Sequence, residues 1–142
     1  MQTALNFETL ASLLLAVALG AVVGFERERT HKPAGLRTHM LVSLGSCLFT
    51  IISISFNTTP AQIAAGIVAG IGFIGAGTIW AEKDKVQGIT TAASLWATAA
   101  VGITVGIGDY ALASFTTLLV FIILISRHLL LRLGIEQPYN GH

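Results

Sequence analysis

The chain has 142 residues, which is enough for one domain, and 54% of them are hydrophobic while only 11% are charged. Soluble domains usually carry about 25% charged residues, so this composition is typical of a protein that lipid surrounds. The single cysteine, Cys47, excludes an intrachain disulfide. The net charge of +1 gives no reason to expect a nucleic acid as a partner.

Five apolar segments follow one another along the chain, and each approaches the roughly 20 residues that a membrane-spanning helix needs. We predict spans at about 7–25, 40–56, 60–81, 89–107 and 110–131. The alternative is a compact soluble helical bundle, but no segment has the charged face that such a helix would expose. The sequence therefore predicts an all-α, polytopic integral membrane protein with five transmembrane helices, in one domain that covers 1–142.

Residues that favour helix ends separate these spans. Pro33 ends the first span, because proline restricts the residue before it and cannot continue the helix. Residues that can cap a helix lie near the start of each span: Asn6, Thr38, Thr59, Thr90 with Thr91, and Asp109. A charged hairpin is predicted at Glu82-Lys83-Asp84-Lys85, between the third and fourth spans.

The basic residues indicate the orientation of the chain. All eight lysines and arginines fall between spans one and two, between spans three and four, or at the end of span five. Loops rich in Lys and Arg stay in the cytoplasm, so we expect an external N-terminus and a cytoplasmic C-terminus. No basic residue precedes the first apolar run, so a cleavable signal peptide is not expected.

The third span is unusually rich in glycine. Glycine inside a helix costs up to about 1 kcal/mol in water, and in lipid its usual advantage is close packing of two backbones. Two interpretations remain open, namely packing against span four or a second copy of the chain, and a discontinuous helix whose exposed backbone binds an ion. Span four has its own stripe of small residues at Ser94, Thr98, Gly102 and Gly106. The glycines of span three are Gly66, Gly70, Gly72, Gly75 and Gly77.

Few side chains in the sequence can carry chemistry. Glu26 lies at a helix C-terminus, where the helix dipole disfavours a carboxylate, so it either pairs with a cation (most plausibly Arg37) or is solvated. Four acidic residues on the same side, Glu26, Glu28, Glu82 and Asp84, offer at most a weak magnesium site beside competing basic neighbours. His31 and His39 are interpreted as loop residues, and Trp96 as a packing residue. We predict no catalytic residue, no resident metal and no cofactor.

Three stretches of the chain resemble the MgtC/SapB family of bacterial inner-membrane proteins. They are GFERERTHKPAGLRTHMLVSLGS (24–46), IAAGIVAGIGFIGAGTI (63–79) and VQGITTAASLWATAAVGITVGIG (86–108). Together they cover about half of the chain in the expected order. Many family members continue into a soluble C-terminal domain, whereas this sequence ends soon after span five.

The resemblance implies a regulatory membrane protein and not an enzyme. Family members are linked to magnesium homeostasis, to growth at low magnesium and, in pathogens, to survival in macrophages, and some bind the F-type ATP synthase. The expected partners are therefore the lipid bilayer, another membrane protein and a second copy of the chain. The alternative function is a small oligomeric transporter or channel for Mg²⁺ or another small solute. The functional positions that the motifs imply are Glu26, Arg27, Gly35, Arg37, Thr38, Gly70, Gly72, Gly75, Gly77, Thr90, Thr91 and Trp96.

Overall fold

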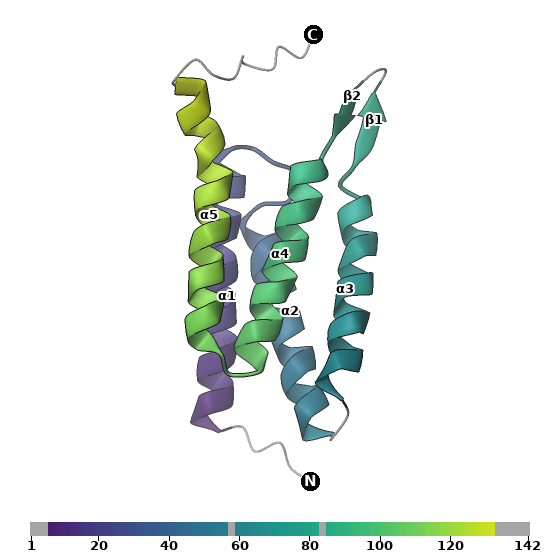
Figure 1. Ribbon diagram of the computed structural model, residues 1–142, viewed down its shortest axis with the longest axis vertical. Helices are drawn as coiled ribbons and strands as arrows, with labels where there is room; N and C mark the ends of the chain where they lie inside the picture. The colour runs from purple at the N-terminus through teal and green to yellow at the C-terminus, as the bar shows by residue number, and fades with distance from the viewer. Residues whose placement is uncertain (1–5, 57–58, 83–84, 133–142) are drawn as a thin grey trace.

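A computed structural model describes residues 6–56, 59–82 and 85–132. In these residues five helices and one short β-hairpin lie side by side as an antiparallel bundle (Figure 1). The predicted all-α membrane fold is confirmed. The elements are α1 Phe7–Arg29, α2 Leu36–Ser55, α3 Pro60–Ala76, β1 Trp80–Glu82, β2 Lys85–Gln87, α4 Ile89–Gly106 and α5 Tyr110–Arg132.

The helices run alternately up and down, so C-terminal ends of some helices lie beside N-terminal ends of others. The C-terminal ends of α1, α3 and α5 lie with the N-terminal ends of α2 and α4 and with the hairpin at the upper end of Figure 1. The basic side chains of the α1–α2 connection, Lys85 and Arg127 therefore belong to one end of the bundle, as their spacing predicted. We call this end, with its loops and hairpin, the charged end.

Three predicted boundaries are wrong, and the first is the end of α1, which continues beyond residue 25 to Arg29. α2 begins at Leu36 and not near residue 40, because the chain reverses at Gly35 and the helix includes Arg37 and His39. α3 ends at Ala76 and not near residue 81, because β1 takes up the chain from Trp80. Among the described residues, four helices are long and apolar enough to cross a membrane, and Ala61–Ala76 is a shorter apolar helix.

Helix α1 packs closely on α2 through glycine. A Cβ atom on Gly20 would lie 2.7 Å from the carbonyl oxygen of His39, and one on Gly24 would lie 2.7 Å from Cα of Leu36. Neither contact leaves room for a side chain. In lipid, where association of helices relies on packing, such close backbone approach stabilises a helix pair.

Helix α4 packs on another face of α2 in the same way. A Cβ atom on Gly102 would collide with the carbonyl oxygen of Ser43, and one on Gly106 would lie 2.6 Å from Cβ of Thr50. The small-residue stripe of α4 that was identified in the sequence therefore faces α2 and not α3. As a result α2 lies between two glycine-bearing neighbours.

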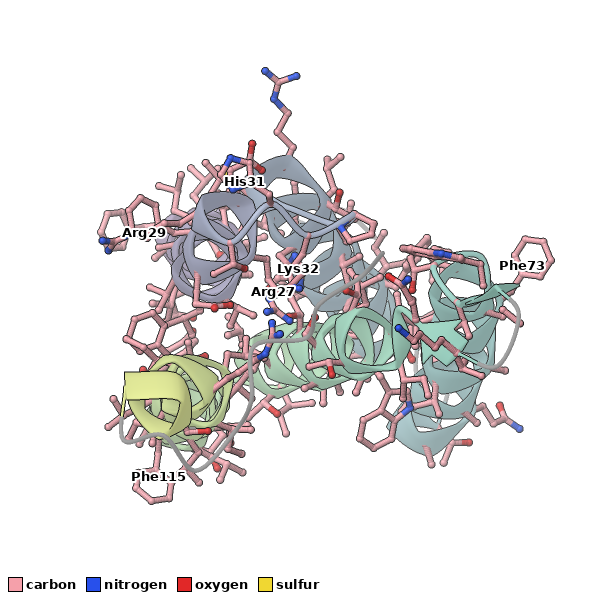
Figure 2. All side chains as sticks on the ribbon, turned by 90° about the horizontal axis from the view of Figure 1, so that it is seen from above. Arg27, Arg29, His31, Lys32, Phe73 and Phe115 are labelled. Atoms are coloured by element: carbon pink, nitrogen blue, oxygen red, sulfur yellow. The ribbon has the colours of Figure 1, made fainter. Side chains whose placement is uncertain are left out.

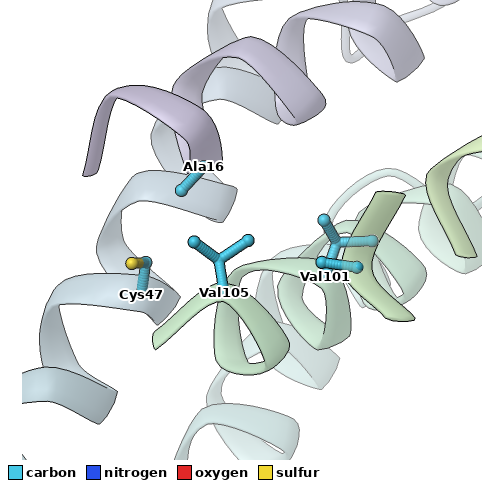
Figure 3. Packing of buried hydrophobic residues seen from close by; sticks show 5 residues of the cluster. Ala16, Cys47, Val101 and Val105 are labelled. Atoms are coloured by element: carbon cyan, nitrogen blue, oxygen red, sulfur yellow. The ribbon is translucent and has the colours of Figure 1, made fainter. Parts of the chain in front are cut away.

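Small and polar side chains make up much of the interior of the bundle, whereas many large hydrophobic side chains are exposed on its surface. Leu14, Phe49 and Phe115 are among the exposed ones. Buried apolar residues fill the remaining space, and Figure 3 shows Ala16, Cys47, Val101 and Val105 of this cluster. This distribution suits a solvent of lipid tails, which is as apolar as a leucine side chain. The buried polar residues of α2 and α4 are His39, Ser43, Ser46, Thr50, Ser53, Thr91, Ser94 and Thr98.

Helix α3 packs differently from the other helices. Nothing in the described chain lies within 4 Å of a Cβ placed on Gly66, Gly70 or Gly72. A Cβ placed on Gly75 would lie 3.4 Å from Cβ of Ala92 on α4. The predicted close packing of α3 on α4 therefore holds at Gly75 and is wrong for Gly66, Gly70 and Gly72. Residues 60–76 form one α-helix, so this segment is not a discontinuous helix.

Candidate functional site

The charged end is built around the sharp turn that joins α1 to α2. The N–H of Lys32 donates to the carbonyl of Arg27 at 3.0 Å, and His31 adopts a left-handed conformation with φ of 54°. This is the geometry with which many helices satisfy their last carbonyl groups. It places His31 in the loop, as predicted, and sets Lys32 beside the end of α1.

A carboxylate from α1 caps α2. Oε2 of Glu28 accepts a hydrogen bond from the N–H of Leu36 at 3.0 Å. A side chain on Gly35 would collide with this carboxylate, so the position requires glycine because of close approach. The predicted cap, Thr38, is wrong, because Thr38 lies within the first turn of α2.

Glu26 and Arg27 form a buried ion pair. Nε of Arg27 donates to Oε2 of Glu26 at 2.8 Å, and the two side chains are 4% and 6% exposed. The predicted pair of Glu26 with Arg37 is therefore wrong, and Arg37 lies exposed on α2. Within the described part of the chain, Oε1 of Glu26 and Nη1 of Arg27 have no hydrogen-bond partner.

A cavity of about 840 Å³ opens beside this pair. Arg27, Lys32 and Arg127 line it with positive charge, and His31 also borders it. Figure 2 shows Arg27 and Lys32 directed into the space between the α1–α2 turn and α4, whereas Arg29 points away from the bundle. Burial, and then the positive charges of Arg127 and Arg27, lower the pKa of Lys32, while the nearby Glu26 charge opposes this effect.

The start of α4 forms another wall of the cavity. Gly88 precedes the helix with φ of 88°, and a side chain there would collide with the carbonyl of Thr78. No side chain caps this helix, so the predicted capping role of Thr90 and Thr91 is wrong. Both threonines line the cavity, together with Trp80, Val86, Gln87 and Ile89. The positive end of the α4 dipole is thus directed at the cavity.

The other predicted site residues lie away from this cavity. Trp96 is half exposed on α4, so the packing interpretation of this side chain is wrong. Gly72 lies exposed on α3, and Gly77 follows its C-terminus. Gly70 borders a second, apolar groove of about 670 Å³ between α2 and α3. We call this the α2–α3 groove; it is lined by Thr38, Leu41, Val42, Gly45, Ser46, Phe49, Gln62, Ile63, Gly66, Ile67, Gly70, Ile71 and Ile74.

Sequence reasoning missed His39, which was interpreted as a loop residue. His39 is fully buried in α2. Its Nδ1–H donates to the carbonyl of Gly35 at 2.9 Å, and its Nε2 lies 3.1 Å from Oγ of Ser94 on α4. The side chain therefore links the start of α2 to α4. Gly35 could have indicated an earlier start of this helix, because glycine is tolerated at the N-cap. A helix that begins at Leu36 includes His39 in its first turns.

The weak magnesium site has little support from the geometry. Within 6–56, 59–82 and 85–132, no group of three or more His, Cys, Asp or Glu residues could hold a metal ion. Glu26 pairs with Arg27, and Glu28 caps α2. Asp84 and the side chain of Glu82 lie outside the described residues.

Comparison with known proteins identifies relatives along most of the chain. "Protein MgtC" of Brucella abortus (strain 2308) is 46% identical over 120 residues, which are 83% of this chain and 50% of the relative. "Putative magnesium transporter YhiD" of Escherichia coli (strain K12) is 42% identical over 122 residues, which are 79% of this chain and 56% of the relative. "Protein MgtC" of Salmonella typhimurium (strain LT2) is 42% identical over 117 residues, 82% of this chain and 51% of the relative.

The chain spans about half the length of these curated relatives. No solved structure matches it. The MgtC family model matches residues 13–133, which include most of α1, all of α2 to α5 and the cavity at the charged end. The chain therefore belongs to the MgtC family.

Proposed function

We propose that this protein is an integral membrane regulator linked to magnesium homeostasis, and that it acts by docking on another membrane protein such as the F-type ATP synthase. The link to magnesium rests on the family and on the name of the relative YhiD. The docking surface consists of the α2–α3 groove and the exposed glycine face of α3. In this proposal the protein regulates its partner and is not an enzyme.

The observation that carries this proposal is the contrast between two sets of glycines. Those of α1 and α4 are in close contact with α2, whereas Gly66 and Gly70 border the groove with nothing near them in the described chain. Glycine is unfavourable in a helix interior unless close approach compensates for it. A transmembrane helix of a partner, laid along α3, would supply that approach and fill the apolar groove.

Reconstitution with F-type ATP synthase in proteoliposomes tests the proposal. We expect the wild-type protein to slow ATP-driven proton pumping and the Gly66→Leu and Gly70→Leu variants to lose the effect while keeping their helix content. Leu118→Ala, on the exposed surface of α5, serves as the control. Unchanged pumping in the presence of wild-type protein would reject the synthase as the partner.

A transporter for Mg²⁺ is the second candidate, and the name of YhiD favours it. The cavity at the charged end argues against it, because Arg27, Lys32 and Arg127 would repel a divalent cation. Flux into proteoliposomes separates the two functions. Saturable Mg²⁺ uptake by the purified protein would replace the regulatory proposal with the transport one.

A further inference from the structure

We infer that the cavity at the charged end is a binding site for a phosphate-bearing anion, held by Arg27, Lys32, Arg127 and the first turn of α4. The ligand class is a phosphate group, either inorganic phosphate or a phosphate monoester or diester. Two sources share this chemistry, namely the headgroup of an anionic lipid and a free phosphate in the cytoplasm. The site is separate from the α2–α3 groove and does not depend on what binds there.

The first argument is the unused hydrogen-bonding capacity of Arg27. The residue is 3% exposed, and its Nη1 has no hydrogen-bond partner in the described chain although it lines the cavity. A buried donor that stays unpaired costs roughly 1–3 kcal/mol, and more when it is charged. Because Glu26 accepts from Nε, the other N–H groups of the guanidinium, those of Nη1 among them, remain for a ligand that binds in the cavity.

The second argument is the charge around the cavity. Arg27, Lys32 and Arg127 face it, and no acidic side chain of the described residues is among those that line it. The nearby Glu26 offsets one of the three positive charges, which leaves an excess that the negative charge of a phosphate group would offset. Burial, and then the positive charges of Arg127 and Arg27, lower the pKa of Lys32, as expected for a partly desolvated cation beside like charges. A bound anion would relieve this repulsion.

The third argument is the orientation of α4. This helix has 18 residues, and no side chain caps its N-terminus. The N–H groups of a helix's first turn and its dipole together favour an oxyanion. A tetrahedral phosphate has enough oxygens to accept from Arg27, from Lys32 and from these N–H groups at once. A carboxylate offers two oxygens that lie in one plane with its carbon, whereas the oxygens of a phosphate group are arranged tetrahedrally and can meet donors from several directions, so the arrangement favours phosphate.

The fourth argument is the position of the cavity in the membrane. It lies at the charged end of a bundle whose helices span the bilayer, and Trp80 and Ile89 give it an apolar border. Tryptophan is enriched at the membrane–water interface, the level at which lipid phosphates lie. Both a lipid headgroup and a soluble phosphate can therefore reach the site.

Two binding measurements on the purified 142-residue chain in an uncharged detergent test the inference and separate the two sources. The first titrates inorganic phosphate against chloride at matched ionic strength. The second adds phosphatidylglycerol against phosphatidylcholine, and native mass spectrometry counts retained lipids. We expect saturable stabilisation against heat in at least one titration. A response to inorganic phosphate alone assigns a soluble ligand, a response to phosphatidylglycerol alone assigns a lipid, and both responses assign a site for either.

Matched charge variants show whether binding occurs in this cavity. Lys32→Gln and Arg127→Gln leave the Glu26–Arg27 pair intact and should raise the dissociation constant by roughly ten- to hundredfold, as expected for a lost charge-assisted hydrogen bond. Arg29→Gln and Arg37→Gln remove the same charge outside the cavity and should have little effect. The inference fails if wild-type protein responds to neither phosphate source, or if all four variants weaken binding equally.

Discussion

At the scale of single residues, Arg27 makes the contact that sequence reasoning assigned to Arg37. Neighbouring residues on a helix point about 100° apart, so a pair at positions i and i+1 is not expected from spacing. The side chains of Glu26 and Arg27 meet nevertheless, and both are buried. Removing one member leaves the other charge buried without compensation.

We therefore predict that Glu26→Gln and Arg27→Gln each lower the midpoint of thermal unfolding in detergent. Loss of one partner of a buried pair typically costs about 3–5 kcal/mol. A double-mutant cycle of the two should give a coupling energy of about 0.5–3 kcal/mol. The cycle of Glu26→Gln with Arg37→Gln is the control and should give none. Equal coupling in the two cycles would contradict the observed pairing.

The lowered pKa of Lys32 leads to a second prediction at this scale. A lower pKa leaves more neutral amine at a given pH, so Lys32 should react with an acylating reagent faster at pH 9 than an ordinary lysine. Arg127→Gln removes one of the charges that lower the pKa, so the pKa should rise and the reaction should slow. Peptide mass spectrometry after timed labelling measures both rates. A faster reaction of Lys32 in the Arg127→Gln variant would show that the Arg127 charge does not lower the pKa of Lys32.

At the scale of helices, glycines in similarly apolar segments differ in whether they contact another helix of this chain. Those of α1 and α4 bring α2 close, whereas three glycines of α3 have open space beside them. The hydroxyl of Thr50 donates to the carbonyl of Ser46 within α2, as that of Thr98 does to Ser94 within α4. These two hydroxyls are thus satisfied inside their own helices, whereas the contact of His39 with Ser94 links α2 to α4.

We predict that Gly24→Ala destabilises the protein and that Gly66→Ala does not. The added methyl on Gly24 would be forced against the backbone of Leu36, and overpacking of this kind costs about 1–3 kcal/mol. The same methyl on Gly66 meets nothing in the chain and removes an unfavourable helix residue. Unfolding of both variants in one detergent provides the comparison. If Gly66→Ala lowered stability as much as Gly24→Ala, then Gly66 would be in close contact with a group outside this chain, such as a second copy.

At the scale of the whole molecule, the bundle separates its charges from its apolar surface. The charged end carries Arg27, Lys32 and Arg127, and the α4–α5 connection at the opposite end is short and contains Gly108 and Asp109. Asp109 caps α5 by accepting from the N–H of Leu112 at 3.0 Å, as its position in the sequence predicted. Because lysine and arginine remain cytoplasmic, the charged end should face the cytoplasm.

Cysteine labelling in a Cys47→Ser background tests this orientation. His31 lies in the α1–α2 turn and Ile107 at the opposite end of the bundle, and both are exposed. We expect His31→Cys to react only when a membrane-impermeant reagent reaches the cytoplasmic face, and Ile107→Cys only from the external face. Reaction of both from one face would contradict the fold, and the reverse assignment would invert the orientation.

The sequence by itself determined the properties that depend on composition and on neighbouring residues. Five helices, the hairpin, the caps at Asn6 and Asp109 and the common end of the basic residues all follow from apolar length and local hydrogen bonding. These features need no knowledge of which helices are neighbours. The third helix was predicted too long, because the apolar run continues through Trp80 into a strand that composition does not separate from a helix.

Only the tertiary structure decided how the helices are turned and what meets at the charged end. Each helix is apolar on nearly every side, so periodicity could not show which glycines face α2 or that His39 is buried. The pairing of Glu26 with Arg27 depends on tertiary packing that buries both side chains. The cationic cavity joins α1, α4 and α5, which are far apart in sequence. Such a site arises from lateral packing in the membrane, which local sequence does not encode.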